Sequence, residues 1–308
     1  MSCRGTDPPA MSRRNFIRFA SAAALAAFGG DASPIVMRPV PRTGERLPVI
    51  GLGTWQTFDV GAAEAERGPL REVLRLFVEH GGAVVDSSPM YGRAETVLGA
   101  LAAELAVRPR LFIATKVWTS GREAGIRQME ESLRRLRVGT VDLMQVHNLV
   151  DWRTHLATLR RWKEQGRVRY IGVTHYSESA YGELERVLRA EELDFLQVNY
   201  SVAERAAERR LLPLAVDRAV AVLVNRPFAQ AALFDRVRGV PLPPWTAEYG
   251  CRTWAQLFLK FVVSHPAVTC AIPATRRSDH LLENLRAGTP PLPDARGRNR
   301  IARALAEL

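Results

Sequence analysis

Cysteine, lysine and the usual nucleotide-binding glycine pattern are scarce or missing in this sequence. Three cysteines, Cys3, Cys251 and Cys270, are too few and too widely spaced for a disulfide framework or a metal site, so we predict neither. Cys270 lies in an apolar run and is expected to be a buried free thiol. No Gly-x-Gly-x-x-Gly motif is present, which argues against a Rossmann-type nucleotide site.

The sequence also lacks an apolar run long enough to cross a bilayer, which takes about 20 residues. The alanine-rich stretch from Ala20 to Phe28 is shorter and follows Arg13-Arg14-Asn15-Phe16-Ile17. Paired arginines before such a stretch resemble a twin-arginine export signal. We therefore predict a leader over residues 1–33, export to the periplasm, and no stable membrane span in the mature chain. The alternative is the basic tail of a cytoplasmic protein.

The net charge is +11, and +9 remains without residues 1–33. Basic residues alternate with acidic ones, and no basic block carries interleaved aromatics, so we predict no nucleic-acid partner. Only 3 of the 43 basic residues are lysine, at positions 116, 163 and 260. Lysine is a compact charge with a shiftable pKa, unlike arginine. The presence of a lysine at the end of an apolar run, at Lys116, therefore indicates a candidate catalytic residue.

Residues 34–308 are predicted to form one α/β domain, a (β/α)₈ TIM barrel. The chain has 308 residues, 47% of them hydrophobic, and no clear linker divides it. Short apolar runs alternate with stretches of helical periodicity, which favours parallel strands and crossover helices. The expected strands lie near residues 47–55, 83–85, 111–116, 141–147, 170–173, 195–199, 221–224 and 268–272. The expected helices lie near residues 69–80, 94–105, 124–136, 152–165, 180–190, 208–217, 253–264, 278 onward and 293–308.

Three consecutive predicted strands end on titratable residues. The second strand ends at Asp86 and is followed by Tyr91, the third ends at Lys116, and the fourth ends at His147. A single such residue is usually structural, for instance a turn former or a member of an ion pair. In a closed barrel, however, all strand C-termini share one face, where such enzymes place their sites. The four residues are therefore predicted to converge.

These residues resemble the aldo-keto reductase family. The similarity runs from about Leu47 to about Leu285 and rests on motifs in the right order at comparable spacing. They are Asp86 with Tyr91-Gly92, Lys116 closing Ala-Thr-Lys, His147 closing Val-Asp-Leu-x-x-Val-His, the Glu131–Leu136 segment, Ile272-Pro273-Ala274-Thr275 and Glu283-Asn284. The resemblance implies reduction of an aldehyde or ketone, a small-molecule carbonyl substrate, with hydride from a nicotinamide cofactor.

The implied catalytic roles can be examined chemically. Tyr91 is the expected proton donor, and a tyrosine has an unperturbed pKa near 10. We expect Lys116 and His147 to lower the pKa of Tyr91, Asp86 to orient Lys116, and His147 to orient the substrate carbonyl.

No side chain supplies a hydride, so a dinucleotide must. The resemblance implies NADPH as the first choice, with NADH as the alternative. It places the carboxamide at Thr174, His175 and Gln197, where two of three family residues have changed, and puts Asn225 and Arg226 where the family often stacks an aromatic. It places Thr275, Arg276, His280, Glu283 and Asn284 around the adenosine phosphate of the cofactor, and the remaining implied cofactor residues are Gly53 and Thr54.

The substrate pocket is predicted to be open, because the loop after His147 is short. Trp55 and Trp118 are its expected walls, with Trp152 as a further candidate. The altered nicotinamide residues keep open a non-catalytic, nicotinamide-binding or redox-sensing subunit. A different barrel enzyme, such as an isomerase or lyase, is a third reading. The substrate, the direction of reaction and the oligomeric state stay open.

Overall fold

The computed structural model describes residues 33–308. The predicted export signal lies outside these residues. No helix in this described range is long and apolar enough to span a membrane.

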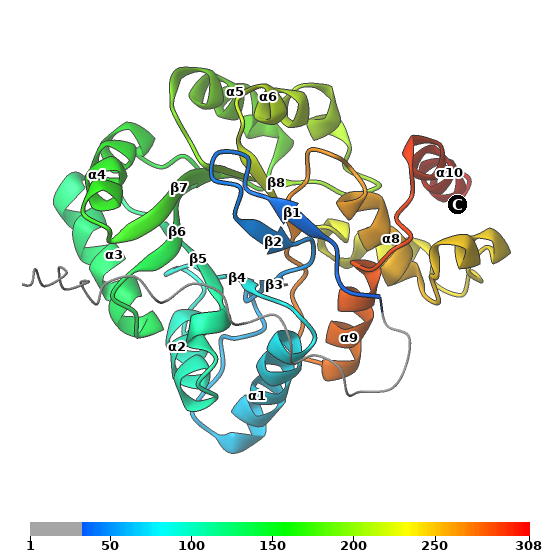
Figure 1. The fold of residues 1–308 in the computed structure, drawn as a ribbon, viewed down its shortest axis with the longest axis horizontal. Coiled ribbons are helices and arrows are strands. Elements are labelled where there is room, and N and C mark those ends of the chain that lie inside the picture. Colours follow the sequence, from blue (N-terminus) through cyan, green and yellow to red (C-terminus); the bar gives the residue numbers. More distant parts are fainter. Residues whose placement is uncertain (1–32) are drawn as a thin grey trace, which may run out of the picture. The chain divides into compact units, whose positions relative to one another are not determined.

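Eight parallel strands form the centre of the structure and confirm the predicted barrel (Figure 1). Their order in the sheet is the order of the chain, from β3 to β10. The bounds are β3 Leu52–Gly53, β4 Val84–Asp86, β5 Phe112–Val117, β6 Val141–His147, β7 Val168–Thr174, β8 Phe195–Asn199, β9 Ala221–Asn225 and β10 Cys270–Ala271. Parallel bridges from Ile50 to Ala271 and from Gly53 to Ala274 join the first strand to the last.

Helices surround the barrel and confirm the predicted alternation (Figure 1). They are α1 Glu64–Glu79, α2 Ala94–Glu104, α3 Arg122–Leu136, α4 Trp152–Glu164, α5 Tyr181–Ala190, α6 Leu211–Asp217, α8 Trp254–Val263 and α9 Ser278–Ala287. Helix α1 begins more than a turn before Pro69, where the prediction began it. Its first turn carries Glu64 and Glu66, whose charges suit a helix N-terminus.

Side chains inside the barrel change from apolar at one end to polar at the other. Alternate residues of a strand point to the same side, so Phe112, Ala114 and Lys116 of β5 all face inward. Phe112, Tyr170 and Phe195 pack together near the N-terminal strand ends, with ring centroids 5.4 to 5.8 Å apart. The polar residues lie at the C-terminal ends of the strands. This end of the barrel is called the mouth below, and the candidate catalytic residues are found there.

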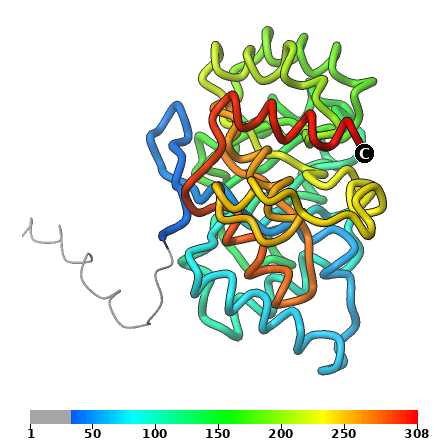
Figure 2. The backbone as a smooth tube through the Cα atoms, turned by 90° about the vertical axis from the view of Figure 1, so that its right-hand side faces the viewer, coloured from blue at the N-terminus to red at the C-terminus, as the bar shows by residue number. Residues whose placement is uncertain are grey.

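A short antiparallel hairpin covers the other end of the barrel and was not predicted from the sequence. The prediction that the first barrel strand begins near residue 47 is wrong, because Leu47 and Pro48 belong to this hairpin and the barrel strand is only Leu52–Gly53. The hairpin consists of β1 Met37–Pro39 and β2 Arg46–Pro48, and Figure 2 shows it (blue) at one end of the molecule. Val40 and Leu47 join the apolar interior. Glu45 accepts hydrogen bonds from Arg169 and Tyr170. The hairpin therefore closes the end opposite the mouth.

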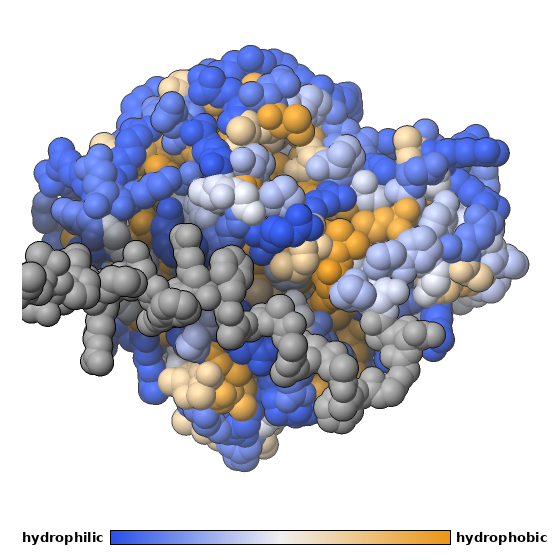
Figure 3. Space-filling model, in the orientation of Figure 1, coloured by the Kyte–Doolittle hydropathy of each residue, from blue (hydrophilic) through white to orange (hydrophobic). Residues whose placement is uncertain are grey.

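The C-terminal part adds elements outside the eight repeats. Helix α7 Ala232–Arg236 was not predicted, whereas helix α10 Ala295–Ala306 was. Arg298 of α10 is buried and donates to the Tyr200 hydroxyl at 2.5 Å and to Glu208 Oε1 at 2.6 Å. This buried contact anchors α10 to the segment that follows β8. On the hairpin face, the peripheral helices are mainly hydrophilic (Figure 3).

Candidate active site

A buried ion pair joins the ends of β4 and β5. Lys116 Nζ lies 2.7 Å from Asp86 Oδ2 and also donates to the Ser87 carbonyl at 2.7 Å. The Lys116 side chain is fully buried and that of Asp86 is 4% exposed. Burying charges is costly unless they are paired and hydrogen-bonded, and both conditions hold. Asp86 therefore fixes the ammonium in place, as the sequence predicts.

Tyr91 lies against both Lys116 and His147. The Lys116 ammonium is 4.9 Å from the centroid of the Tyr91 ring. The rings of Tyr91 and His147 meet edge to face, with centroids 6.1 Å apart. The structure thus brings together all four residues that the sequence singled out, although they come from different strands and loops.

The balance of charge and burial around Tyr91 differs from the prediction. Burial raises the pKa of Tyr91 and outweighs the lowering effect of Lys116, so the pKa lies above 10. The expected lowering is therefore wrong, because burial of the phenol outweighs the charge of Lys116, and the Asp86 carboxylate further raises the pKa of Tyr91. The phenol stays protonated at neutral pH and can act as a proton donor.

His147 is a neutral imidazole. Burial, followed by the nearby positive charges of Lys116 and His175, lowers the pKa of His147 to about 2. Ser88 Oγ lies 3.3 Å from His147 Nδ1 and accepts a bond from the Met90 amide at 3.4 Å. When the Ser88 hydroxyl donates to Nδ1, the single proton of the neutral imidazole lies on Nε2. His147 can therefore donate a hydrogen bond to a carbonyl. Because it is neutral, it adds no positive charge that would lower the pKa of Tyr91, so that expectation is wrong.

Two glutamines hold the other oxygen of Asp86. Gln197 Nε2 donates to Asp86 Oδ1 at 2.8 Å, and Gln145 Nε2 does so at 3.3 Å. Gln197 Oε1 also accepts from the Thr174 hydroxyl at 2.9 Å. Both ends of Gln197 are therefore engaged within the protein. The structure gives Gln197 a role in fixing Asp86 beside the cofactor role that the resemblance implies.

Thr54 and Gly53 serve the packing of β3. The Thr54 hydroxyl donates to the Asp86 carbonyl at 2.9 Å and to Ser87 Oγ at 3.0 Å. A Cβ atom on Gly53 would come within 2.8 Å of the Ile272 carbonyl. Glycine is thus required for the close approach that joins β3 to the end of β10.

Asn225, the last residue of β9, and His175, which follows β7, form a polar pair that suits a nicotinamide carboxamide. Asn225 Nδ2 donates to the His175 carbonyl at 3.2 Å. Asn225 Oδ1 and Asn148 Oδ1 are buried without hydrogen-bond partners in the described chain. Unpaired buried acceptors are costly, and a carboxamide NH₂ group bound beside Asn225 would satisfy its Oδ1. These residues therefore fit a nicotinamide.

The five residues assigned to the adenosine phosphate lie together between β10 and α9 or on α9 itself, apart from the catalytic group. Thr275 and Asn284 are buried, whereas Arg276 and His280 are exposed. Glu283 accepts a hydrogen bond from the Thr253 hydroxyl. Arg276 has no carboxylate partner within the described residues, so its charge is available for a phosphate.

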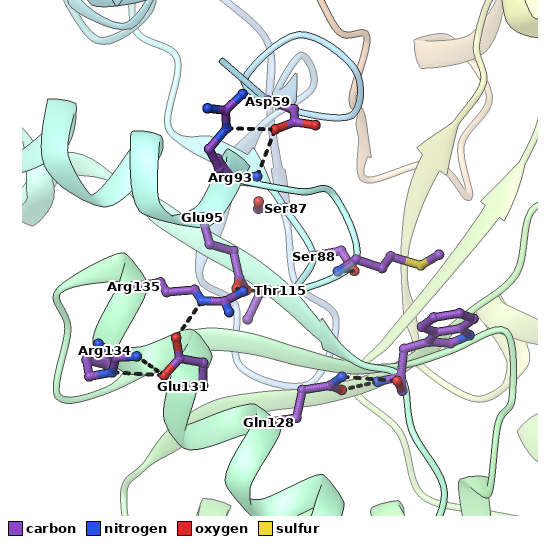
Figure 4. A network of polar contacts seen from close by, with 12 residues as sticks. Asp59, Ser87, Ser88, Arg93, Glu95, Thr115, Gln128, Glu131, Arg134 and Arg135 are labelled. Atoms are coloured by element: carbon purple, nitrogen blue, oxygen red, sulfur yellow. Dashed lines mark hydrogen bonds and ion pairs between the residues drawn. The ribbon is translucent and has the colours of Figure 1, made fainter. Parts of the chain in front are cut away.

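Two tryptophans line the rim of the mouth, and the third does not. Trp55 follows β3 and is 45% exposed, while Trp118 follows β5 and is 41% exposed. The amide group of Gln128 bonds both the backbone N–H and the carbonyl of Trp118, at 2.5 and 3.1 Å, and so holds this rim residue (Figure 4). The prediction that Trp152 lines the pocket is wrong, because its side chain is buried on α4 and its indole N–H donates a hydrogen bond to Glu183 on α5.

A buried carboxyl group contacts β5 on its outer side, at the residue before Lys116. Glu95 of α2 is fully buried and accepts from the Thr115 hydroxyl at 2.6 Å (Figure 4). Its other oxygen, Oε2, has no hydrogen bond, and Arg135 approaches it only to 3.8 Å. Burial raises the pKa of Glu95. An ionised Glu95 therefore destabilises the folded protein at neutral and alkaline pH.

Replacing Glu95 by Gln should stabilise the protein as the pH rises. The pKa of Glu95 is higher in the folded than in the unfolded state, so its favourable contribution is present below the unfolded value of 4.5 and is lost as the pH rises through the folded value. The amide of the Glu95→Gln variant keeps the acceptor for Thr115 and carries no charge. We expect a gain of about 1–3 kcal/mol in unfolding free energy at pH 8, the cost of an unsatisfied buried group. Urea denaturation at pH 5 and pH 8 measures it.

Glu131→Gln is the matched control. Glu131 is a surface residue whose pKa is lowered by hydrogen bonds from Arg134 and Arg135. Its contribution is present above the unfolded pKa, so its removal should slightly destabilise the protein at pH 8. A Glu95→Gln variant that is less stable at pH 8 than at pH 5, relative to the wild type, would contradict the assignment.

The sequence analysis missed Ser88, Gln145 and Tyr176. Ser88 and Gln145 lie beside predicted residues and act through His147 and Asp86. Their inward direction could have been read from the two-residue alternation along each strand. Tyr176 stacks on His175, with ring centroids 5.3 Å apart, and no sequence signal marks it.

Known reductases resemble this chain in sequence and in fold. The model of the Aldo/keto reductase family matches residues 49–298. The chain is 29% identical over 245 residues to a methylglyoxal reductase of Escherichia coli, covering 77% of this chain and 84% of that protein. It is 25% identical over 296 residues to the L-glyceraldehyde 3-phosphate reductase of the same species, covering 80% and 85%. The crystal structure of an aldo-keto reductase from Klebsiella pneumoniae in complex with NADPH superimposes with a TM-score of 0.74 at 27% identity, covering 89% and 95%.

Proposed function

Since the chain belongs to the aldo/keto reductase family, we propose that Tyr91 is the proton donor in its NAD(P)H-dependent reduction of carbonyl groups. The observation that carries this role is the contact of the Tyr91 ring with the paired ammonium of Lys116 and with His147. An oxidoreductase of this kind must protonate the oxygen of the carbonyl as the carbon accepts a hydride.

Each residue then has a defined task. His147, with its proton on Nε2, donates a hydrogen bond to the carbonyl oxygen and orients it. The Tyr91 hydroxyl gives its proton to that oxygen, and the adjacent Lys116 ammonium stabilises the phenolate that remains. Asp86, held by Gln145 and Gln197, keeps the ammonium in place. A bound reduced nicotinamide supplies the hydride for the carbonyl carbon.

NADPH is the proposed cofactor, with NADH as the alternative. The support is the uncompensated charge of Arg276 beside Thr275 and Asn284, together with the NADP and NADPH complexes of similar Klebsiella pneumoniae proteins. A guanidinium recognises a 2′-phosphate through charge-assisted hydrogen bonds. His175, Asn225 and Thr174 would contact the carboxamide.

Small aldehydes are the proposed substrates. Relatives are named as reductases of methylglyoxal, glyoxal and L-glyceraldehyde 3-phosphate. The purified protein should oxidise NADPH in the presence of methylglyoxal, followed as the loss of absorbance of the reduced cofactor. A thermal-shift titration with NADPH and NADH reports binding independently of turnover. Tight cofactor binding without turnover of any carbonyl would support a non-catalytic subunit instead.

Export to the periplasm is proposed from residues 1–33 alone. Support comes from Arg13-Arg14 followed by an apolar stretch. Replacing both arginines by lysine should keep the protein in the cytoplasm of a bacterium with a twin-arginine pathway, measured by cell fractionation. Unchanged distribution of the variant would reject the signal.

A further inference from the structure

Arg226 reaches across the mouth of the barrel. It follows β9 directly, in a left-handed backbone conformation with φ 51°. Its guanidinium lies 4.2 Å from the centroid of the Tyr176 ring, which belongs to the segment after β7. Because β8 lies between β9 and β7 in the sheet, the side chain of Arg226 extends over the end of β8.

This direction is away from the region assigned to the adenosine phosphate. That region, around Thr275 and Asn284, follows β10, which is the neighbour of β9 on its other side. The Tyr176 ring beneath the guanidinium itself stacks on His175, which follows Thr174, the β7 partner of His147. The guanidinium is therefore placed to act where a carbonyl substrate would lie.

The charge of Arg226 is not neutralised by an acid. Within residues 33–308, no carboxylate lies within 4.0 Å of its guanidinium, whereas two other arginines in segments that follow strands are paired. Arg93 pairs with Asp59, and Arg277 pairs with Asp279. Arg226 is also partly buried, so solvent screens it less than an exposed side chain.

We propose that Arg226 makes this reductase selective for carbonyl substrates that carry a carboxylate or a phosphate group. The proposal rests on the proposed function and names its substrate class. A guanidinium binds such anions through two parallel hydrogen bonds. Stacking on Tyr176 holds the planar fork before the substrate arrives, which lowers the entropic cost of binding. The family resemblance implies that Arg226 lies among the cofactor residues, and the two roles give different experimental results.

Matched substrate pairs test the role of Arg226. One pair is 4-formylbenzoate and its methyl ester, and the other is glycolaldehyde phosphate and glycolaldehyde. Each pair differs in the anionic group, and together they distinguish carboxylate from phosphate. The wild type should show a higher kcat/KM for at least one anion than for its neutral partner. Arg226→Gln should lower kcat/KM for that anion about 10- to 100-fold, as expected for a lost charge-assisted hydrogen bond, and change the neutral partner less than about threefold.

Three measurements separate the outcomes. The dissociation constant of NADPH should change by less than about twofold in Arg226→Gln. A tenfold rise of this constant, with an equal loss of kcat/KM for the charged and the neutral substrate, would overturn the proposal and indicate a contact with the cofactor. Equal use of the charged and the neutral member of both pairs by the wild type would also overturn it, while leaving the reductase function intact. Failure of the wild type to reduce any carbonyl would instead reject the proposed function.

Two further variants guard against trivial explanations. Arg226→Lys keeps the charge but lacks the planar guanidinium. It should lower the ratio of kcat/KM for the anion to that for its neutral partner about three- to tenfold, which is less than the effect of Arg226→Gln. An unchanged ratio in Arg226→Lys would count against the proposal even if the Arg226→Gln variant unfolds. Arg296→Gln removes an exposed arginine on α10 and should leave both substrates unaffected. Circular dichroism melting confirms that each variant is folded.

Discussion

Replacing Tyr91 by Phe is expected to lower kcat about 10²- to 10⁴-fold, the range attributed to a positioned general acid. The change removes only the hydroxyl, so the ring contacts with Lys116 and His147 persist. Neither neighbour can replace the lost acid. Lys116 is held by Asp86 and Ser87, and the neutral His147 does not carry a second proton to give, because its pKa is about 2. Steady-state kinetics with methylglyoxal and NADPH measures the loss.

Binding and a second tyrosine provide the controls for this result. The NADPH dissociation constant should be nearly unchanged in Tyr91→Phe. Tyr181, whose hydroxyl donates to the Asn199 carbonyl at 2.9 Å, is outside the catalytic group, and Tyr181→Phe should retain kcat while losing some stability. Substantial turnover by the Tyr91→Phe variant would sink the assignment. In the wild type, ionisation of Tyr91 should not reduce kcat below about pH 10, since its pKa is raised.

Breaking the Asp86–Lys116 pair should produce the largest loss of stability. Asp86→Asn leaves a buried ammonium without a counter-charge, and Lys116→Met leaves a buried carboxylate without one. Each single variant should lose about 3–5 kcal/mol of unfolding free energy, as is typical when one partner of a buried pair is removed. The double variant should lose less than the sum of both, because no unpaired charge remains. Urea denaturation of all four proteins gives the coupling.

The pH dependence adds an independent test of the pair. Burial alone lowers the pKa of Lys116, and Asp86 and Tyr91 more than offset this, so the folded pKa is raised above 10.5. The stability that Lys116 contributes is thus present below 10.5 and is lost as the pH rises through the folded value. In Asp86→Asn, burial should prevail and lower the pKa of Lys116. The deficit of this variant relative to the wild type should therefore shrink toward alkaline pH; purely additive, pH-independent losses would show that the pair is uncoupled.

Sequence patterns predicted the barrel well because its repeats obey simple physical rules. Runs such as 112–117 and 141–147 are mostly apolar and buried on both faces, as strands between a barrel interior and outer helices are. The β1–β2 hairpin escaped prediction because its strands are only three residues long and one carries little apolar pattern. Helix α1 was predicted to begin late because Pro69 looks like a first-turn residue, yet the acidic residues before it already form the first turn.

For the site, the catalytic residues could be predicted from the sequence, but their pKa shifts and hydrogen-bond partners could not. Residue identity and strand ends suffice to gather Asp86, Lys116 and His147 at one face. The direction of the pKa shift of Tyr91 depends on how deeply the phenol is buried, which no spacing encodes. Likewise, Gln197 could be assigned to a cofactor from the resemblance, but its bonds to Asp86 and Thr174 depend on which side chains share the barrel interior.

The hairpin has a practical consequence for handling the protein. Val36 precedes β1 and bonds the Gly288 carbonyl at the end of α9, so the described chain starts at the end of the barrel remote from Tyr91. A surface tether or purification tag joined ahead of this point would be attached on the far side from the substrate entrance. Immobilisation through the amino-terminal side should thus leave the entrance facing the bulk solution.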